Sequence, residues 1–444
     1  MLFLSGFVQR SKWVENFLTQ TKISSCIQFV CIYFFILYYC LLFGTLRTKK
    51  NQNTLFSIYI MSTSSSAPSS IDPLRIGILG CANIAKKNAI AILEAPQQAC
   101  CIHAVASRNL EKAEAFCNVI HSHKVTATIK PTTITRFGGS TAYDNLIQSA
   151  EIDAVYIPLP TALHKEWVLK ALQNGKHVLL EKPVAVVAQD YEEMLQVAKE
   201  HQKFLMDGTM FVHHPRTDHF VRTVQDRTLL GQLVRLEAGF SFCGDDGFLQ
   251  NNVRVKKDGD LLGCLGDLGW YVVRLALLVV GPEAKLKSAH VTDYQVNDCG
   301  IPIDTTCLVH FSNNVVLSFH CGFKSHFRQY VKVVGTKAGA SMNDFVLPKL
   351  HPVTYQIESM GLTEFDLITE HEMKEEEFDG PVQEALMWDT FARLANAIDA
   401  EGWTGTSEDC QQALNLSRIS TENQKILDAL MTSIAKGGVK VEFP

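Results

Sequence analysis

Short apolar runs alternate with amphipathic segments in the first part of the chain, and this alternation predicts strands and helices in turn. Three runs have the mostly apolar composition of strands buried on both faces of a sheet: 74–79, 102–106 and 152–158. Helical patterns lie between such runs, for example the segment that opens at His164 and ends at Gly175. Short connections between alternating strands and helices predict a parallel, doubly wound sheet with helices on both faces.

Later in the chain the apolar positions recur with a period of two instead. Residues 234–240 alternate in this way, which is typical of a strand with one buried face. The runs 307–311 and 315–319 flank Asn313 and Asn314, and paired asparagines tolerate the positive φ of a tight hairpin turn. These patterns predict a mostly antiparallel sheet.

By these patterns the chain is an α/β protein in three parts. Residues 74–205 are expected to form a Rossmann domain, and 206–444 an α+β domain whose open sheet has one face on helices and the other available to another molecule. The extension 1–73 contains a mostly apolar run of about twenty residues, 26–46, which is long enough to span a bilayer. Alternatively, translation begins at Met61, and the Ser- and Pro-rich leader that follows is typical of a soluble enzyme. We favour this start and a cytoplasmic location, with a single-pass membrane anchor as the alternative.

The run from His177 ends abruptly in a carboxylate, an amine and a proline, Glu181-Lys182-Pro183. A proline disfavours the helical conformation in the residue before it, so Lys182 is expected to stay extended at the end of a strand. In doubly wound sheets, ligands bind at that end of the strands. A lysine there is more often a solvated surface charge, so its meaning depends on the motifs around it.

A turn of small residues follows the first strand. Gly80, Ala82 and Ala85 stand at the spacing of a dinucleotide-binding turn, in which the pyrophosphate rests on the N-terminus of the next helix. Ala82 is the weaker match, because its methyl group restricts the approach of the phosphate. Close packing alone is the other explanation of such a turn. The expected cofactor contacts are Gly80, Ala82, Asn83 and Ile84.

The second strand ends in Ser107-Arg108, where a protein that prefers NAD normally carries an acid for the ribose 2′-hydroxyl. No acid is present, and an arginine accommodates a 2′-phosphate. The sequence therefore favours NADP over NAD, with Ser107 and Arg108 as further contacts. A solvated loop charge is the alternative for Arg108.

Another cluster, Gly266 to Tyr271, precedes an apolar helix that stops at Gly281-Pro282. Asp267 is expected at the start of this helix, where its charge suits the helix dipole. The i, i+4 spacing of Asp267 and Tyr271 puts a carboxylate and a phenol on one face, so both can point into one cleft. A helix cap and a core aromatic are the plainer alternatives.

In this order and spacing the motifs resemble the glucose-fructose oxidoreductase, inositol dehydrogenase and rhizopine-catabolism (Gfo/Idh/MocA) family. The resemblance covers about residues 74–440, and Glu181-Lys182-Pro183 carries most of it. Tyr271 narrows it to a branch of plant oxidoreductases similar to dimeric dihydrodiol dehydrogenase and NADP-dependent xylose dehydrogenase, since many other members carry histidine there. The segment Pro160-Thr161 to His164 also fits the family.

The resemblance implies an NADP-dependent enzyme that moves a hydride between nicotinamide and a CH–OH or C=O carbon of a sugar, polyol or vicinal diol. Lys182 would stabilise negative charge on the reacting oxygen, and Tyr271 would exchange its proton at a pKa lowered by Lys182 and the oxidised nicotinamide. Asp267 and His164 would position the substrate, while Glu181 would hold Lys182 or a cofactor ribose. The other implied cofactor contacts are Pro160, Thr161, His164 and Lys182 itself. A homodimer through the C-terminal sheet is also implied, and a non-catalytic NADP-binding regulator on the same fold is the alternative.

Composition adds some bounds. A net charge of −5 argues against nucleic acid as the main partner. The 13 cysteines, an odd number without a Cys-x-x-Cys pair, favour free thiols in a reducing compartment. His213 and His214 would point to opposite faces of a strand and could not bind one ion, so no metal site is expected. A membrane is expected as a partner only if the N-terminal extension is expressed. Residues 121–139 exceed the usual connection length and predict an exposed loop.

Overall fold

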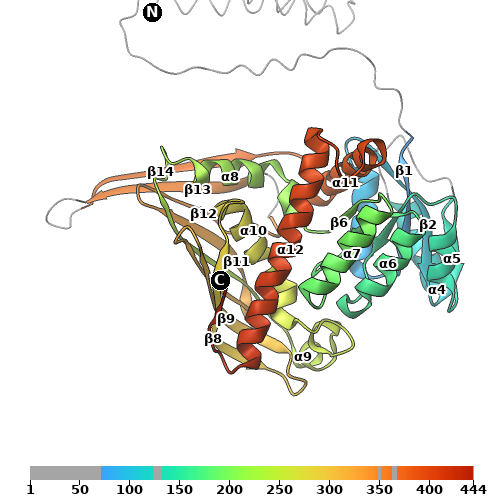
Figure 1. Cartoon of the computed structure of the whole chain (residues 1–444), viewed down its shortest axis with the longest axis horizontal. Helices are drawn as coiled ribbons and strands as arrows, with labels where there is room; N and C mark the ends of the chain where they lie inside the picture. Colours follow the sequence, from blue (N-terminus) through green and yellow to red (C-terminus); the bar gives the residue numbers. More distant parts are fainter. Residues whose placement is uncertain (1–71, 124–132, 349–351, 363–367, 444) are drawn as a thin grey trace, which may run out of the picture. The chain divides into compact units, whose positions relative to one another are not determined.

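The computed structural model describes residues 72–123, 133–348, 352–362 and 368–443, which all belong to one compact unit, Ser70–Pro444 (Figure 1). The apolar run 26–46 and the alternative start at Met61 lie outside the described residues. None of the described helices is long and apolar enough to cross a membrane.

The first sheet has six parallel strands in the order β3-β2-β1-β4-β5-β6, which confirms the predicted doubly wound Rossmann fold. Its strands are β1 (Leu74–Leu79), β2 (Cys100–Ser107), β3 (Thr135–Gly138), β4 (Ala154–Ile157), β5 (His177–Leu180) and β6 (Leu205–Asp207). β4 and β5 are buried along their whole length, as a sheet covered on both faces requires. The strand order reverses between β1 and β4, so a ligand crevice is expected at the carboxyl ends of these two strands.

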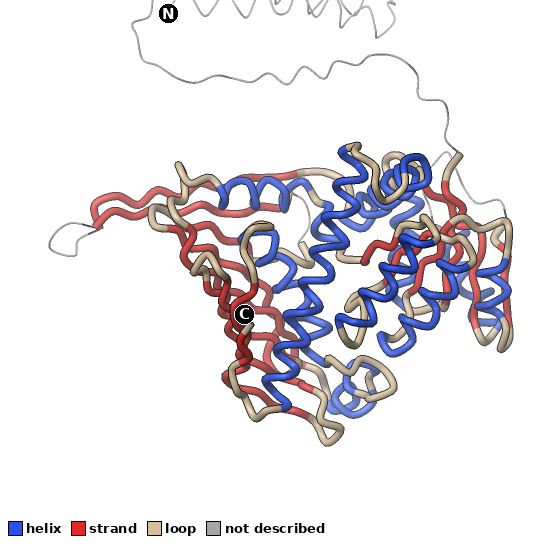
Figure 2. The backbone as a smooth tube through the Cα atoms, in the orientation of Figure 1, coloured by secondary structure: helices blue, strands red, loops and turns tan. Residues whose placement is uncertain are grey.

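The connecting helices are α3 (Asn83–Glu94), α4 (Leu110–Ser122), α5 (Ala142–Gln148), α6 (His164–Gln173) and α7 (Ala188–Glu200), with the 3₁₀ turn η1 (Thr161–Leu163) before α6 (Figure 2). Local interactions set their ends. The side chain of Asn109 accepts a hydrogen bond from the backbone nitrogen of Lys112 (3.1 Å) where α4 begins. Gly175, just after α6, has a φ of 71°, and the helix predicted from His164 is confirmed.

The prediction of an exposed loop at 121–139 is wrong at its end. Residues Thr135–Gly138 form the edge strand β3, which pairs in parallel with Ala104–Ser107 of β2. This strand has only four residues, most of them exposed, and no apolar run that would mark it in the sequence. Its pairing with β2, a tertiary contact, makes it a strand.

The second sheet has nine strands in the order β14-β13-β12-β11-β7-β10-β9-β8-β15. Among the described strands of this second sheet, only β7 and β10 pair in parallel, so the prediction of a mostly antiparallel sheet is confirmed. The strands are β7 (Leu233–Cys243), β8 (Leu286–Val296), β9 (Pro302–Phe311), β10 (Val316–Gly322), β11 (Lys324–Gly335), β12 (Gly339–Met342), β13 (Val353–Leu362), β14 (Ile368–Phe378) and β15 (Val441–Glu442). The predicted hairpin is β9–β10, with Asn314 at a φ of 64° in its turn.

The helices of this second part are α8 (Pro215–Gln225), α9 (Asp246–Asn251), α10 (Trp270–Val280), α11 (Gln383–Glu401) and α12 (Glu408–Ala435). α8, α10 and α12 contact strands of the nine-stranded sheet. In Figure 1, α12 runs between that sheet and the nucleotide-binding part of the unit. One face of the second sheet is thus covered by helices, as predicted.

The two halves interlock more than a division at 205/206 suggests. β6 continues to Asp207, and the C-terminal helices return to the first sheet: α11 contacts α3 and β2, and α12 contacts α7 and β6. Lys87 Nζ on α3 lies 2.5 Å from Glu384 Oε1, and Trp388 Nε1 donates a hydrogen bond to Asn88 Oδ1 (3.0 Å). Helices near the end of the chain therefore complete the nucleotide-binding half.

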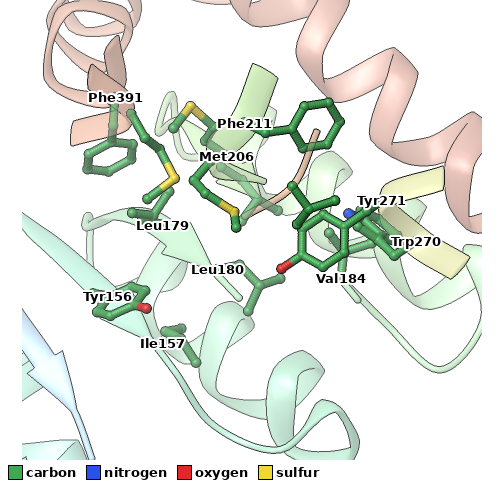
Figure 3. Packing of buried hydrophobic residues seen from close by; sticks show 14 of the residues in the cluster. Tyr156, Ile157, Leu179, Leu180, Val184, Met206, Phe211, Trp270, Tyr271 and Phe391 are labelled. Carbon is green, nitrogen blue, oxygen red and sulfur yellow. The ribbon is translucent and has the colours of Figure 1, made fainter. Parts of the chain in front are cut away.

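One continuous hydrophobic core links both halves. Figure 3 shows a part of this core, in which Leu180 and Met206 belong to the same cluster as Phe211 and Tyr271. The ring centroids of Phe211 and Tyr271 are 6.2 Å apart. The ring of Tyr271 is therefore fixed by apolar packing.

Candidate active site

The turn after β1 has the features that a dinucleotide pyrophosphate requires. Gly80 has a φ of 95°, which glycine adopts without strain, and a Cβ there would stand 3.4 Å from the Tyr143 hydroxyl. The N-cap residue of α3, Ala82, makes no side-chain cap hydrogen bond, and the first turn carries no acidic residue. The first backbone N–H groups of α3, around Asn83 and Ile84, are therefore available to an anion.

A basic rim surrounds this turn. Ser107 is buried at the end of β2, and Arg108 beside it is exposed. Burial raises the pKa of the Cys81 thiol, while a hydrogen bond with Ser107 and the charges of Lys86 and Lys112 oppose the rise. These two lysines were missed by the sequence analysis; Lys86 lies on α3, whereas Lys112 lies on α4 and nears the turn only through the fold. With Arg108 they supply positive charge of the kind that a 2′-phosphate requires.

The loop after β4 forms one lip of the site. The backbone nitrogen of Thr161 donates to Asp260 Oδ1 (3.1 Å), and the Thr161 hydroxyl donates to the same oxygen. The backbone nitrogen of Ala162 donates to the carbonyl of Gly259 (3.2 Å). Thr161 therefore ties the loop that carries Pro160 to the second half of the chain.

His164 does not line this site. Its side chain is 0% exposed, and its ring nitrogens lie 2.8 Å from the carbonyl oxygen of Leu159 and 3.3 Å from that of Val184. Burial lowers the pKa of His164, which favours the neutral imidazole. The predicted contact of His164 with substrate does not fit this geometry; the residue links the loop after β4 to the segment after β5.

Lys182 lies two residues beyond the last residue of β5, at the end of the strand as predicted, and its side chain is 10% exposed. Its ammonium nitrogen is 2.8 Å from Asp267 Oδ1, 2.9 Å from the backbone oxygen of Asp267, and 4.8 Å from the centroid of the Tyr271 ring. Burial opposes the charge on Lys182, but Asp267 and Tyr271 outweigh it and hold the pKa of the lysine above its ordinary value. The structure thus brings an ammonium, a carboxylate and a phenol together.

Asp267 lies near the start of the helical segment, as predicted, and the alternative that it is only a helix cap is wrong. Asp267 lies inside the π-helical turn η4 (Leu265–Gly269), which leads directly into α10 and in which a backbone N–H bonds five residues back. A Cβ on Gly266 would stand 3.1 Å from Pro183 Cγ, so glycine lets this turn approach the end of β5. Such turns are frequent at functional sites.

Arg254 shares the carboxylate of Asp267 with Lys182. It lies on the 3₁₀ turn η3 (Val253–Val255), with Nε 2.8 Å from Asp267 Oδ2. Burial raises the pKa of Asp267, but Lys182 and Arg254 together lower it to about 2. Both carboxylate oxygens are therefore engaged by protein cations, and Asp267 positions Lys182 more directly than it can position a substrate. Nothing local in the sequence marks Arg254 as its partner.

Tyr271 differs from the prediction in its ionisation. Burial raises its pKa to about 12, although the charge of Lys182 opposes the rise. The prediction of a lowered pKa is wrong for the chain itself, because desolvation of the phenolate outweighs one nearby ammonium. Tyr271 consequently carries its proton at neutral pH.

Glu181 ends a chain of buried hydrogen bonds. The hydroxyl of Tyr156 on β4 donates to Glu181 Oε1 (2.5 Å) and accepts from Asn88 Nδ2 (2.8 Å) on α3. Asn88 in turn accepts from Trp388 on α11, and Glu181 Oε2 accepts from the backbone nitrogen of Lys182 (3.3 Å). Burial raises the pKa of Glu181 despite its bond with Tyr156. The sequence offered one clue to this hydrogen-bond chain: Tyr156 and Asn88 are polar residues within otherwise apolar, buried segments.

A cavity of about 530 Å³ collects these groups. The predicted residues that line it are Ala82, Asn83, Ile84, Pro160, Glu181, Lys182, Asp267 and Tyr271. The predicted residues outside its lining are Gly80, Ser107, Arg108, Thr161 and His164. Lining residues that the sequence analysis missed are Pro158, Leu159, Phe240, Phe242, Val253, Arg254, Asp260, Leu268, Phe327, Val346 and Leu347.

Within the described ranges, no group of three or more His, Cys, Asp or Glu side chains is placed to hold a metal ion. The strand assumed for His213 and His214 is wrong. His213 ends the 3₁₀ turn η2 (Met210–His213), and His214 caps α8 by accepting from the backbone nitrogen of Arg216 (3.1 Å).

A cavity that runs from a dinucleotide turn to a buried ammonium and phenol meets the needs of hydride transfer, and this places the chain in the class of nicotinamide-dependent oxidoreductases. Residues 74–209 match the family model described as "Oxidoreductase family, NAD-binding Rossmann fold", and residues 220–341 match the "GFO/IDH/MocA C-terminal domain". The chain belongs to the Gfo/Idh/MocA family, which confirms the resemblance of its motifs.

Three curated relatives illustrate its similarities. A dTDP-3,4-didehydro-2,6-dideoxy-alpha-D-glucose 3-reductase of Actinomadura kijaniata is 30% identical over 65% of this chain and 79% of its own length. A D-xylose 1-dehydrogenase (NADP(+)) of Haloferax volcanii is 26% identical over 83% of this chain and 100% of its own. A trans-1,2-dihydrobenzene-1,2-diol dehydrogenase of Mus musculus is 27% identical over 62% of this chain and 76% of its own length.

Solved structures share the fold. A 3-ketoreductase from Actinomadura kijaniata in complex with NADP and TDP-benzene has a TM-score of 0.66 at 24% identity, covering 81% of this chain and 98% of that one. An aldose-aldose oxidoreductase from Caulobacter crescentus complexed with glycerol has a TM-score of 0.66 at 18% identity, covering 84% and 100%. At these identities the likeness concerns the fold alone.

Proposed function

We propose that this chain is an NADP(H)-dependent oxidoreductase that transfers a hydride between nicotinamide and the CH–OH or C=O carbon of a sugar, polyol or vicinal diol. The observation that carries the proposal is the placement of Lys182 and Tyr271, organised by Asp267, in a cavity that begins at the N-terminus of α3. The activities named for the relatives, on a dTDP-sugar, on xylose and on a diol, support it.

The chemistry follows from the contacts of two side chains. A bound nicotinamide supplies the hydride in reduction and accepts it in oxidation. Two of the three N–H donors of Lys182 contact Asp267, which leaves one for the reacting oxygen. The fixed ammonium stabilises negative charge on that oxygen, and Tyr271, protonated at neutral pH, donates the proton in reduction.

The groups that would hold the cofactor lie at the carboxyl ends of the first sheet. The N-terminal turn of α3, which the tight turn at Gly80 leads into, would hold the pyrophosphate, and Arg108, with Ser107 beside it, would hold the 2′-phosphate. Pro160 would contact the cofactor, and Glu181, fixed by Tyr156, would accept from its ribose. Thr161 and His164 act indirectly, by holding the loops around the cofactor.

We also propose a homodimer, formed through the open face of the nine-stranded sheet, and a cytoplasmic location. Three apolar side chains on this face alternate with buried neighbours and stay at least partly exposed, opposite the helices: Leu308, Val316 and Val334. All cysteines in the described ranges are free, which suits a reducing compartment. Sedimentation over a range of concentrations tests the dimer, and a monomer at all of them would refute it.

A panel assay tests the proposed function. Purified protein is incubated with NADPH or NADH and aldehydes, ketones and open-chain sugars, and with NADP⁺ and the matching alcohols and diols, while nicotinamide absorbance is followed. We expect turnover with NADPH and little with NADH. Tight NADPH binding without turnover of any compound would refute the enzyme and favour the non-catalytic regulator, which the Lys182–Tyr271 pair argues against.

A further inference from the structure

Arg254 uses only part of its guanidinium within the protein. Its Nε lies 2.8 Å from Asp267 Oδ2, and one terminal nitrogen, Nη1, donates to Asn252 Oδ1 at 3.4 Å. Among the described residues, nothing else accepts a hydrogen bond from its terminal nitrogens, although Arg254 lines the cavity and its side chain is 39% exposed. A guanidinium has five N–H donors and no acceptor, so three donors on the outer edge of Arg254 remain for a ligand.

The backbone around Arg254 is fixed, so this edge is presented in one place. Asn252 Oδ1 accepts from the backbone nitrogen of Arg254 (3.1 Å) at the start of η3. At its other end, the carbonyl of Val255 accepts from Asn297 Nδ2 (2.8 Å). The turn is thus held from both sides, and the donors of Arg254 are organised before a ligand binds.

The two cations of the cavity outnumber the acid that they share. Lys182 and Arg254 both pair with Asp267, and this trio carries one unbalanced positive charge. The other acids of the lining accept hydrogen bonds from hydroxyl groups of β4 and of the loop after it: Glu181 and Asp260. Asp260 also raises the pKa of Arg254, but less than Asp267 does. Most of the remaining lining is apolar, and such walls strengthen the attraction between the trio and an anion.

A carboxylate fits the outer edge of Arg254 best. It presents two coplanar oxygens that accept hydrogen bonds and no hydrogen to donate, which matches the planar fork of an arginine. A hydroxyl needs an acceptor for its own hydrogen, and the guanidinium has none. Because Lys182 and Arg254 each lie 2.8 Å from an oxygen of Asp267, the two cations are neighbours. A substrate whose reacting oxygen contacts Lys182 therefore has the substituent of the reacting carbon within reach of Arg254.

We propose that the substrate is a sugar-derived 2-oxo acid, with a carboxylate attached to its reacting carbon, and that Arg254 is the specificity-determining residue that binds this carboxylate. The inference rests on the proposed function and narrows its substrate class. In the reaction, the carbonyl carbon accepts the hydride of NADPH, its π-electron pair moves to the oxygen, and that oxygen takes the proton of Tyr271, which regains one from solvent. NADPH is oxidised to NADP⁺, and the 2-oxo acid is reduced to the 2-hydroxy acid with its carboxylate unchanged.

The experiment uses two matched pairs in NADPH-dependent reduction: 2-keto-D-gluconate with D-fructose, and hydroxypyruvate with dihydroxyacetone. In each pair, the carboxylate of the acid replaces a CH₂OH group on the same carbonyl carbon. We expect kcat/KM to favour the acids by about 10- to 100-fold, as a hydrogen bond to a charged group would give. Arg254→Gln should abolish most of this preference, and Arg254→Lys, which keeps the charge without the fork, should retain part of it.

The ratio within each pair separates substrate contact from an indirect effect. Arg254 also holds Asp267, so its loss slows both members of a pair through Lys182, whereas a direct contact with the carboxylate changes their ratio. Lys257→Gln is the control for general attraction of anions, because Lys257 is an exposed cation close to Arg254 in the chain that does not line the cavity. This variant should keep the ratio of the wild type.

Each outcome has a definite meaning. Equal or faster turnover of the neutral members, turnover of other carbonyls but of neither acid, or a ratio unchanged in Arg254→Gln overturns the inference and leaves the proposed function standing. If Arg254→Gln does not fold, Arg254→Lys takes its place, and an unchanged ratio there overturns the inference equally.

If no compound is turned over, calorimetric titration of the NADP⁺-loaded protein with 2-keto-D-gluconate and with D-fructose tests the carboxylate site separately. Binding of the acid that weakens in Arg254→Gln would support the site although the enzyme proposal had failed. Absence of such binding, or binding that Arg254→Gln leaves unchanged, overturns the site as well.

Discussion

Replacing Asp267 by asparagine removes the one carboxylate that serves both Lys182 and Arg254, while it preserves the shape of the side chain. The attraction between two unit charges 2.8 Å apart is about 6 kcal/mol at an effective dielectric constant of 20. The amide oxygen and local relaxation retain part of this, so we expect the pKa of Lys182 to fall by about two to three units, at about 1.36 kcal/mol per unit. Burial, which lowers the pKa of the ammonium, is then opposed by a weaker attraction.

The pH profile of kcat for carbonyl reduction is the assay. The proposed mechanism needs the ammonium of Lys182, and the pKa of that group is raised in the native chain, so we expect the wild type to stay active to high pH. In Asp267→Asn the ammonium is lost at lower pH than in the wild type, and an alkaline limb should appear near the ordinary lysine value of about 10.4. Activity below this limb should remain measurable.

Asp260→Asn is the matched control, because Asp260 also lines the cavity but bonds to Thr161 rather than to Lys182. The alkaline side of the pH profile of kcat for Asp260→Asn should follow that of the wild type. Thermal unfolding of both variants separates ionisation from stability, since an uncompensated buried charge costs about 3–5 kcal/mol. A profile of Asp267→Asn that parallels the wild type at every pH, or a limb that appears equally in both variants, would refute the assigned electrostatics.

Four further predictions concern single side chains. Lys182→Met and Tyr271→Phe should each lower kcat by about 10²- to 10⁴-fold with little change in the Kd of NADPH, and near-normal turnover of Tyr271→Phe would remove the phenol from the mechanism. Arg108→Ala should weaken NADPH by about one to two decades, from the loss of a charge-assisted hydrogen bond, and leave NADH nearly unchanged; an equal loss for both cofactors would contradict the 2′-phosphate contact. Because Tyr271 has a pKa raised to about 12, the rate of alcohol oxidation should keep rising with pH above neutrality, and a rate that levels off near pH 7 would show that another group is the base. Tyr156→Phe should raise the KM for NADPH more than it lowers kcat, as expected if Glu181 loses orientation at the cofactor ribose, and a change in stability alone would limit Tyr156 to the core.

The sequence predicts the parts of the fold that local patterns encode. The buried runs at β1, β4 and β5 are apolar because both sheet faces are covered, and the turn at Asn314 needs its positive φ whatever surrounds it. β3 was missed because its strand character comes from pairing with β2, which no pattern within Thr135–Gly138 records.

The candidate site divides in the same way. Lys182 was found because a proline after a buried strand restricts it locally, whereas Arg254 reaches Asp267 only through the path of a loop. The expectation for the pKa of Tyr271 failed because burial, which depends on packing against Phe211 and Phe240, cannot be read from the charges nearby in sequence. The i, i+4 spacing of Asp267 and Tyr271 did bring both to the cavity, although through a π-helical turn rather than a capped helix.

The bond from Trp388 to Asn88 has a consequence for how the protein is made. Glu181, beside Lys182, is held through Tyr156 and Asn88 by a tryptophan of α11, Trp388. During synthesis, the nucleotide-binding half emerges from the ribosome long before α11, and its site stays unfinished until that helix arrives. For the same reason, a chimera that grafts residues 74–209 onto another substrate domain inherits the cofactor turn without its support, unless it also inherits α11.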